Sequence, residues 1–177
     1  MKKGLILYRS KYGATKKYAG MLKEALSCDC DEIGSGKEQE PQAYDWIILA
    51  GGIYAGGIAG LEVLRKNYPM WKDKKLAVFC VGASPYDAKA LEEIRARSMK
   101  GALQDIPVFY GRGAWDESGM TWKDRMLCGM LKKMIAKKDA ASMEPWMKAL
   151  LSAAGKKCDW TDQKYLEPLI QYIRDGE

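Results

Sequence analysis

Apolar residues follow two different patterns along this chain, and these patterns predict strands that alternate with helices. Short runs of consecutive apolar residues are typical of strands buried on both faces of a sheet. Apolar residues three and four positions apart are typical of amphipathic helices. The predicted strands lie at residues 3–9, 29–33, 44–50, 75–81 and 106–110. The predicted helices lie at residues 14–27, about 61–64, 88–100, 120–138 and 160–174. Within the last of these, Pro168 should mark the true start of the helix or a kink.

Strands that alternate with helices in this way predict a parallel sheet with right-handed crossovers and helices on both faces. We expect an α/β fold with a doubly wound, five-stranded parallel sheet in the order 2-1-3-4-5. A helical insertion of about residues 112–158 would follow strand five. The length of 177 residues suits a single domain over residues 1–177.

The first predicted strand ends at a short loop, Ser10-Lys11-Tyr12-Gly13-Ala14-Thr15, and a helical pattern begins at once. The first backbone N–H groups of such a helix have no partner within it, and the helix dipole adds positive charge there. Gly13 permits a positive φ, and Ser10 and Thr15 add hydroxyl groups. The loop lacks both the Gly-Lys-Ser/Thr of a triphosphate-binding loop and the spaced glycines of a dinucleotide site. It therefore predicts a site for a monophosphate, although an ordinary strand-to-helix turn has a similar sequence.

Two further loops are expected at the same edge of the sheet, because the carboxyl ends of parallel strands lie together. They are residues 51–57 after strand three and residues 82–87 after strand four, and both are rich in small residues. Small residues allow the backbone to approach a flat ligand closely. The alternative is that both loops are ordinary tight turns.

The loop Ser10–Thr15 resembles the Ser/Thr-x-x-Gly-x-Thr motif of the flavodoxin-like FMN proteins, with Tyr12 where flavodoxins usually have threonine. Gly51-Gly52-Ile53-Tyr54-Ala55-Gly56 is similar to a glycine-rich segment of the same family that contains Ile-Tyr followed by a glycine. The resemblance implies noncovalently bound FMN, with Tyr54 and Tyr86 as the aromatic residues beside its ring. The cofactor-binding residues that it implies are Ser10, Lys11, Tyr12, Gly13, Ala14, Thr15, Gly52, Ile53, Tyr54, Ala55, Gly56, Gly82, Ala83, Ser84 and Tyr86.

Composition excludes several other kinds of site. The chain has no histidine, so it has no nucleophile–histidine triad and no histidine acid or base. Its five cysteines form no Cys-x-x-Cys pair, and we expect no metal site. We therefore expect no catalytic side chain, because a cofactor would carry the chemistry. No apolar run is long enough for a membrane span or a signal peptide, and we expect a cytoplasmic protein.

The segment 112–158 is basic and rich in methionine. It contains ten Lys or Arg and five Asp or Glu, and thus +5 of the net charge of +6. Within the predicted helix 120–138, apolar residues form one face: Met126, Leu127, Met130, Leu131, Met134 and Ile135. Such a helix can bind an anionic membrane peripherally, hold an apolar substrate or contact a partner protein. The alternative is a helix that only packs on its own sheet.

The long insertion after strand five resembles the branch of the flavodoxin-like family that includes menaquinone-dependent protoporphyrinogen oxidase. The fragments Phe109-Tyr110-Gly111, Trp122–Met126 and Asp159-Trp160 carry this resemblance. Three functions stay open. The first is an FMN-dependent oxidoreductase or electron-transfer protein, the second is a quinone-dependent protoporphyrinogen oxidase, and the third is an interaction module without flavin. The expected partner is a redox protein or a quinone-type small molecule, and not a nucleic acid.

Overall fold

The computed structural model describes residues 2–36, 40–54 and 56–175. Its main sheet has five parallel strands in the order β2-β1-β3-β5-β6, and β4 pairs with β3 antiparallel. The strands are β1 (Gly4–Arg9), β2 (Asp29–Glu32), β3 (Trp46–Tyr54), β4 (Gly57–Ile58), β5 (Lys75–Gly82) and β6 (Val108–Arg112). The parallel strands have the predicted order, since β5 and β6 are the fourth and fifth of them. The prediction that strand three ends at residue 50 was wrong, because β3 continues to Tyr54 and pairs there with β4. The hairpin strand β4 was not predicted, because two residues, one of them glycine, carry no readable period.

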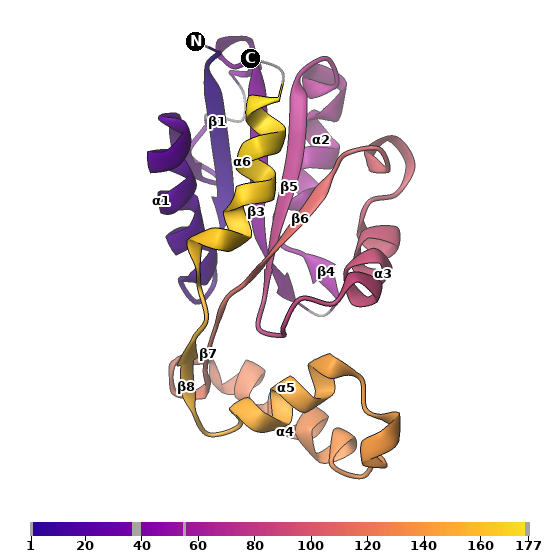
Figure 1. Ribbon diagram of the computed structural model, residues 1–177. Helices are drawn as coiled ribbons and strands as arrows, with labels where there is room; N and C mark the ends of the chain where they lie inside the picture. Colours follow the sequence, from indigo (N-terminus) through magenta and orange to yellow (C-terminus); the bar gives the residue numbers. More distant parts are fainter. Residues whose placement is uncertain (1, 37–39, 55, 176–177) are drawn as a thin grey trace.

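Helices cover both faces of the sheet (Figure 1). α1 and α6 pack on one face and α2 and α3 on the other. The helices of this part of the chain are α1 (Ala14–Leu26), α2 (Leu61–Trp71), α3 (Ala88–Ser98) and α6 (Glu167–Arg174). Pro168 lies in the first turn of α6, where its missing N–H costs no helical hydrogen bond. The final helix therefore begins near Pro168 and has no kink there.

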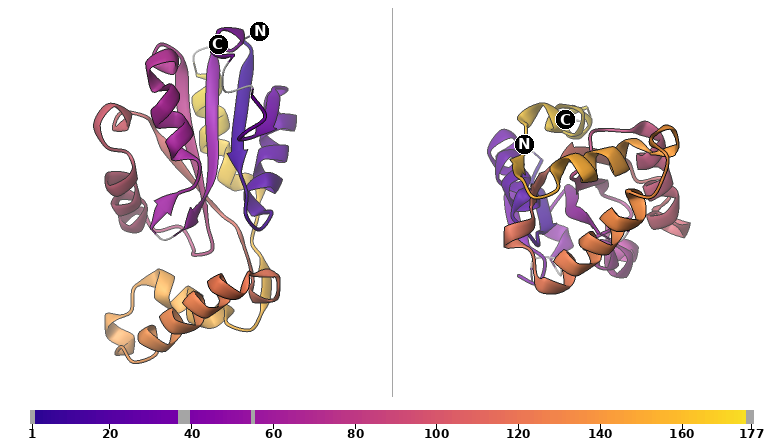
Figure 2. Two further views of the ribbon diagram at one scale, coloured as in Figure 1. Left: turned by 180° about the vertical axis from the view of Figure 1, so that it is seen from behind. Right: turned by 90° about the horizontal axis from the view of Figure 1, so that it is seen from below.

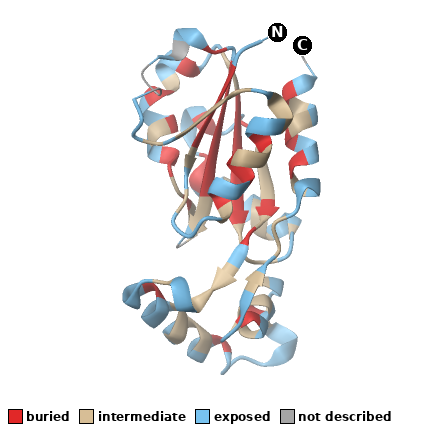
Figure 3. Ribbon diagram, turned by 90° about the vertical axis from the view of Figure 1, so that its left-hand side faces the viewer, coloured by how far each residue is buried: buried red, intermediate tan, exposed pale blue. Residues whose placement is uncertain are grey.

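The core consists of two layers, because successive side chains of a strand point to opposite faces. In β5, Val78 packs toward α2 and α3, whereas Phe79 packs toward α1 and α6. Figure 3 shows buried residues concentrated along these central strands. Continuous apolar runs were thus a reliable signal for strands that helices cover on both sides.

The segment from β7 to β8 lies beyond the carboxyl edge of the sheet, at the bottom of Figure 1 (Figures 1 and 2). It consists of β7 (Ala114–Asp116), α4 (Trp122–Ile135), α5 (Pro145–Ala153) and β8 (Lys157–Asp159). β7 and β8 pair antiparallel and connect the two helices to the sheet. The helical insertion after the fifth parallel strand is therefore present, whereas α5 and the β7–β8 pair were not predicted. That residues 1–177 form one domain stays a prediction.

In the described ranges, none of the helices combines the length and the apolar character that crossing a membrane requires.

Candidate functional site

The loops after β1, β3 and β5 come together at the carboxyl edge of the sheet, which faces α4 and α5 (Figure 1). The register of the strands produces this arrangement, because Arg9 at the end of β1 lies beside Gly51, and Gly51 lies beside Cys80. Three separate segments of the chain therefore meet at one edge of the sheet. The edge where the strand order reverses is the usual ligand site of an open parallel sheet.

The first loop has the features of an anion site. Gly13 has a φ of 93° and precedes α1, and no side chain caps the helix. The first turn of α1 contains no acidic residue. The Gly13 N–H donates to Ser10 Oγ at 3.1 Å, which closes the loop. Thr15 is buried, and a Cβ added at Gly52 would lie 3.7 Å from its Oγ1. The N-terminus of α1 and the last part of β3 thus adjoin.

Asp124 joins α4 to the loop after β1 and to the end of β3. Its Oδ2 forms an ion pair with Lys11 Nζ at 2.5 Å, and its Oδ1 accepts a hydrogen bond from the Tyr54 hydroxyl at 2.5 Å. The Tyr12 hydroxyl also donates to this carboxylate. Thr121, which caps α4, accepts a hydrogen bond from the Asp124 N–H. Asp124 has an exposed fraction of only 5%. A buried carboxylate needs such partners, because an unpaired one would lose its hydration without compensation.

These contacts shift the ionisation of the whole cluster. The Lys11 ammonium and the hydroxyls of Tyr12 and Tyr54 hold the pKa of Asp124 well below its usual range. In return, the hydrogen bond to Asp124 raises the pKa of Lys11 and that of Tyr54. Asp124 and Lys11 therefore both stay charged at neutral pH.

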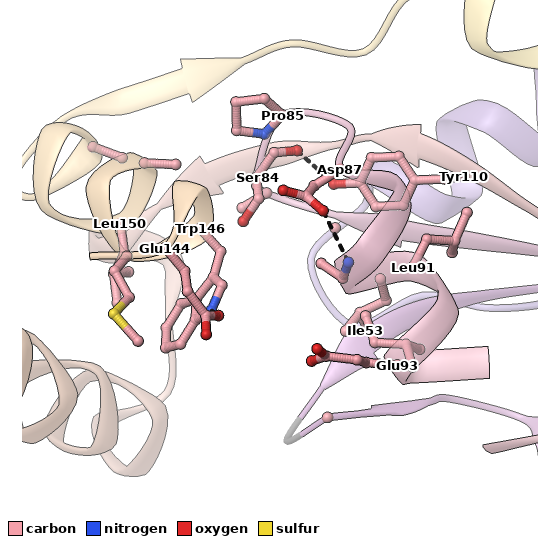
Figure 4. A pocket seen from close by; sticks show the side chains of 18 of the residues that line it. Ile53, Ser84, Pro85, Asp87, Leu91, Glu93, Tyr110, Glu144, Trp146 and Leu150 are labelled. Atoms are coloured by element: carbon pink, nitrogen blue, oxygen red, sulfur yellow. Dashed lines mark hydrogen bonds between the residues drawn. The ribbon is translucent and has the colours of Figure 1, made fainter. Parts of the chain in front are cut away.

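A cavity of about 580 Å³ lies between the sheet edge and the insertion (Figure 4). Its inner wall comes from the loops after β3 and β5 and from α3. Its outer wall comes from α4 and α5, with Leu131, Trp146 and Leu150 among its apolar residues. The volume is in the range of small-molecule and cofactor pockets.

The structure places the predicted site residues in three groups. Ile53, Gly56, Gly82, Ala83 and Ser84 line the cavity. The loop Ser10–Thr15 lies outside its lining but is linked through Asp124 to Tyr54 and α4. The remaining predicted residues lie apart from the lining or cannot be placed: Gly52 adjoins Thr15, Tyr54 bonds Asp124, Tyr86 is 58% exposed, and Ala55 lies outside the described residues.

Several cavity residues were not predicted from the sequence. Tyr110 of β6 lines the inner wall, and its hydroxyl donates to the Ser84 carbonyl at 2.5 Å. Burial raises the pKa of Tyr110, so the phenol stays neutral. Trp115, Trp146 and Trp160 belong to the insertion or follow it directly. The concentration of tryptophan in and beside residues 112–158 was the available signal, but it did not show which ring faces the sheet.

The sheet order, the reversal point between β1 and β3, and the loops gathered there define a flavodoxin-like fold. A family model described as a flavodoxin domain matches residues 5–142, and the chain belongs to this family. No curated protein sequence matches the chain.

Solved structures to which the chain is similar include three flavodoxin-type proteins. A flavodoxin, WrbA-like protein from Agrobacterium tumefaciens is 17% identical, with a TM-score of 0.44 over 87% of this chain and 94% of that one. A flavoprotein in complex with FMN from Lactobacillus acidophilus is 19% identical, with a TM-score of 0.39 over 63% of this chain and 93% of that one. Oxidised flavodoxin 2 from Bacillus cereus is 23% identical, with a TM-score of 0.39 over 61% and 84%.

Proposed function

We propose that the protein binds FMN at the carboxyl edge of the sheet and acts as a flavin-dependent oxidoreductase or electron-transfer protein. The observation that carries this proposal is the pairing of an uncapped helix N-terminus at Gly13 with a neighbouring cavity of about 580 Å³. The residues present fit the two parts of such a cofactor. An anion fits the first turn of α1, and a flat, largely apolar ring fits the cavity.

The residues that would hold the cofactor follow from this division. The loop from Ser10 to Thr15 would bind the phosphate through backbone N–H groups and hydroxyls. Ile53, the backbone of Gly82–Ser84, and Tyr110 would face the ring, and α5 would keep water away from it. When bound, FMN supplies reversible uptake of one or two electrons at its ring.

The direct test is the absorbance spectrum of the purified protein, followed by titration of the cofactor-depleted protein with FMN and with riboflavin. We expect a flavin spectrum, and FMN should bind at least about tenfold more tightly than riboflavin, which is about 1.4 kcal/mol. Equal affinity for the two would contradict the phosphate site. A colourless protein that takes up no FMN would support the third alternative, an interaction module without flavin.

One observation favours the protoporphyrinogen oxidase alternative. The insertion lines the outer wall of the cavity with apolar and aromatic side chains such as Trp146, Met147 and Leu150, which suits an apolar small molecule. The test is turnover of a porphyrinogen with a quinone as electron acceptor. FMN binding without such turnover would favour an electron-transfer protein or another oxidoreductase.

A further inference from the structure

One side of α4 exposes large apolar residues to solvent. These residues form the outer face of α4: Trp122 is 67% exposed, Met126 51%, Leu127 53%, Met130 57% and Met134 64%. Four of them are spaced four positions apart, and Leu127 lies beside Met126, so they share one side of the helix. Contiguous apolar groups of this kind on a protein surface mark interaction sites more often than isolated ones do.

The packing of α4 within the protein does not use this outer face. Asp124 and Ile135 are buried, and Cys128 and Leu131 line the cavity. These four residues lie on the opposite side of the helix, toward α5 and the sheet. The helix is therefore apolar on both sides, and its inner side is the one that packs within the protein.

The outer face is also basic. Lys123 and Lys133 lie between its apolar residues at the spacing of the helix, and Lys137 and Lys138 follow the helix end. All four are exposed, and none has an acidic partner among the described residues. The only acidic residue of α4, Asp124, points inward. A surface with apolar side chains, lysines and no carboxylate complements a layer of anionic headgroups over hydrocarbon.

The position and shape of α4 match a flat surface. α4 and α5 cross the end of the molecule opposite the two chain termini (Figures 1 and 2). The outer face is one side of a single helix of 14 residues, about 21 Å long, and the cavity lies on its other side. Methionine side chains adapt to an irregular apolar medium, and lysine side chains extend their ammonium groups toward phosphates.

We propose that the outer face of α4 docks the protein on an anionic lipid surface, with the helix parallel to the plane of the membrane. The insertion then lies between the membrane and the carboxyl edge of the sheet. This inference does not depend on FMN binding, because the apolar residues and lysines that carry it lie outside the cavity lining.

The test is co-sedimentation of the full-length protein with vesicles of phosphatidylcholine alone and with vesicles in which phosphatidylglycerol replaces one third of it. We expect binding to the anionic vesicles that is about tenfold stronger or more, and that weakens at high salt. Equal or no binding to both vesicles would overturn the proposal.

Two variants separate the apolar from the electrostatic contribution. The first replaces Met126, Met130 and Met134 with Gln, and the second replaces Lys123, Lys133, Lys137 and Lys138 with Gln. Because all these side chains are exposed, both variants should keep the fold, which circular dichroism checks. Each should bind anionic vesicles about tenfold less tightly.

The matched controls change the same residue types elsewhere on the surface. Lys16, Lys66, Lys72 and Lys89 are exposed and lie on α1, at α2 and on α3, and Met70 of α2 is 53% exposed. Replacing these lysines or Met70 with Gln should leave vesicle binding unchanged. If the controls lose as much binding as the α4 variants, general charge is responsible and the proposal fails. The proposal fails also if only the lysine variant loses vesicle binding, because a purely electrostatic face would suit an acidic protein partner instead. It fails too if the wild type forms a dimer through this face and the methionine variant does not.

Discussion

Lys11 and Asp124 form an ion pair of 2.5 Å between the first loop of the sheet and the N-terminal part of α4. Lys11 is half exposed, whereas the Asp124 side chain is nearly buried. The same carboxylate accepts hydrogen bonds from Tyr12 and Tyr54. One side chain of the insertion therefore contacts both the loop that we propose to bind phosphate and the end of β3.

Replacing Asp124 with Asn should loosen α4 from the sheet edge, because Lys11 would lose its ion pair and two tyrosines their charged acceptor. We expect faster proteolysis within residues 112–158 and little change in the melting of the sheet. Asp139→Asn is the matched control, since Asp139 is exposed just beyond α4. Equal proteolysis of the wild type and the Asp124 variant would show that Asp124 does not hold the insertion.

The same attachment should depend on pH in a defined direction. The pKa of Asp124 is lowered in the folded protein. Its contribution to the stability of this attachment is therefore present above the ordinary aspartate pKa of about 3.9 and is lost as pH falls through the lower folded pKa. The pKa of Lys11 is raised, so its contribution is present below about 10.4 and is lost as pH rises through the higher folded pKa. The hydrogen-exchange rates of α4 amides should differ strongly between the wild type and Asp124→Asn at pH values between these two limits. A difference that is constant from acid to alkaline pH would contradict this assignment.

The phosphate loop should be sensitive to changes at Gly13 and Thr15. Gly13→Val places a β-branched residue at a φ of 93°, and the strain should distort the loop. Thr15→Val removes a buried hydroxyl with little change of shape. Each should weaken FMN binding by about 1–3 kcal/mol, measured by fluorescence titration. Gly20→Ala, in the interior of α1 with open space around it, should leave binding unchanged.

Two tryptophans of the insertion should differ in their effect on a bound flavin. Trp146 lines the cavity, whereas Trp122 lies on the outer face of α4. Trp146→Ala should change the fluorescence of bound FMN and weaken its binding by about 1 kcal/mol, if an aromatic contact is lost. Trp122→Ala should change neither. If the two variants behave alike, the insertion does not form the outer wall of the flavin site.

Phe79 should contribute strongly to stability, because it is fully buried in β5 and packs against Tyr18 with ring centroids 5.1 Å apart. Phe79→Ala should lower the free energy of unfolding by about 3–5 kcal/mol, measured by urea denaturation. Met70→Ala on the surface of α2 should change it by no more than about 0.5 kcal/mol. A small effect of Phe79→Ala would mean that this layer of the core rearranges to fill the space.

The sequence predicted the parallel sheet because its signals are local. A strand covered on both faces must be apolar along its length, as in Trp46–Ala50 and Leu76–Val81, and helices that alternate with such strands permit few topologies. The loop at Gly13 was also predictable, since a positive φ before a helix favours glycine. The pairing of β7 with β8 was not, because its partners are about 40 residues apart and each strand has three residues.

For the insertion, the sequence by itself determined that residues 120–138 contain an amphipathic, basic helix. It did not determine which apolar residues face inward, because apolar side chains cover a wide arc of this helix and several orientations bury a similar area. The tertiary structure decided between them. Packing against α5 and the contact of Asp124 with Lys11, Tyr12 and Tyr54 turn Leu131 and Ile135 inward and leave Met126, Met130 and Met134 in solvent. Those contacts join residues 70 to 113 positions apart, and a local period carries no information at that distance.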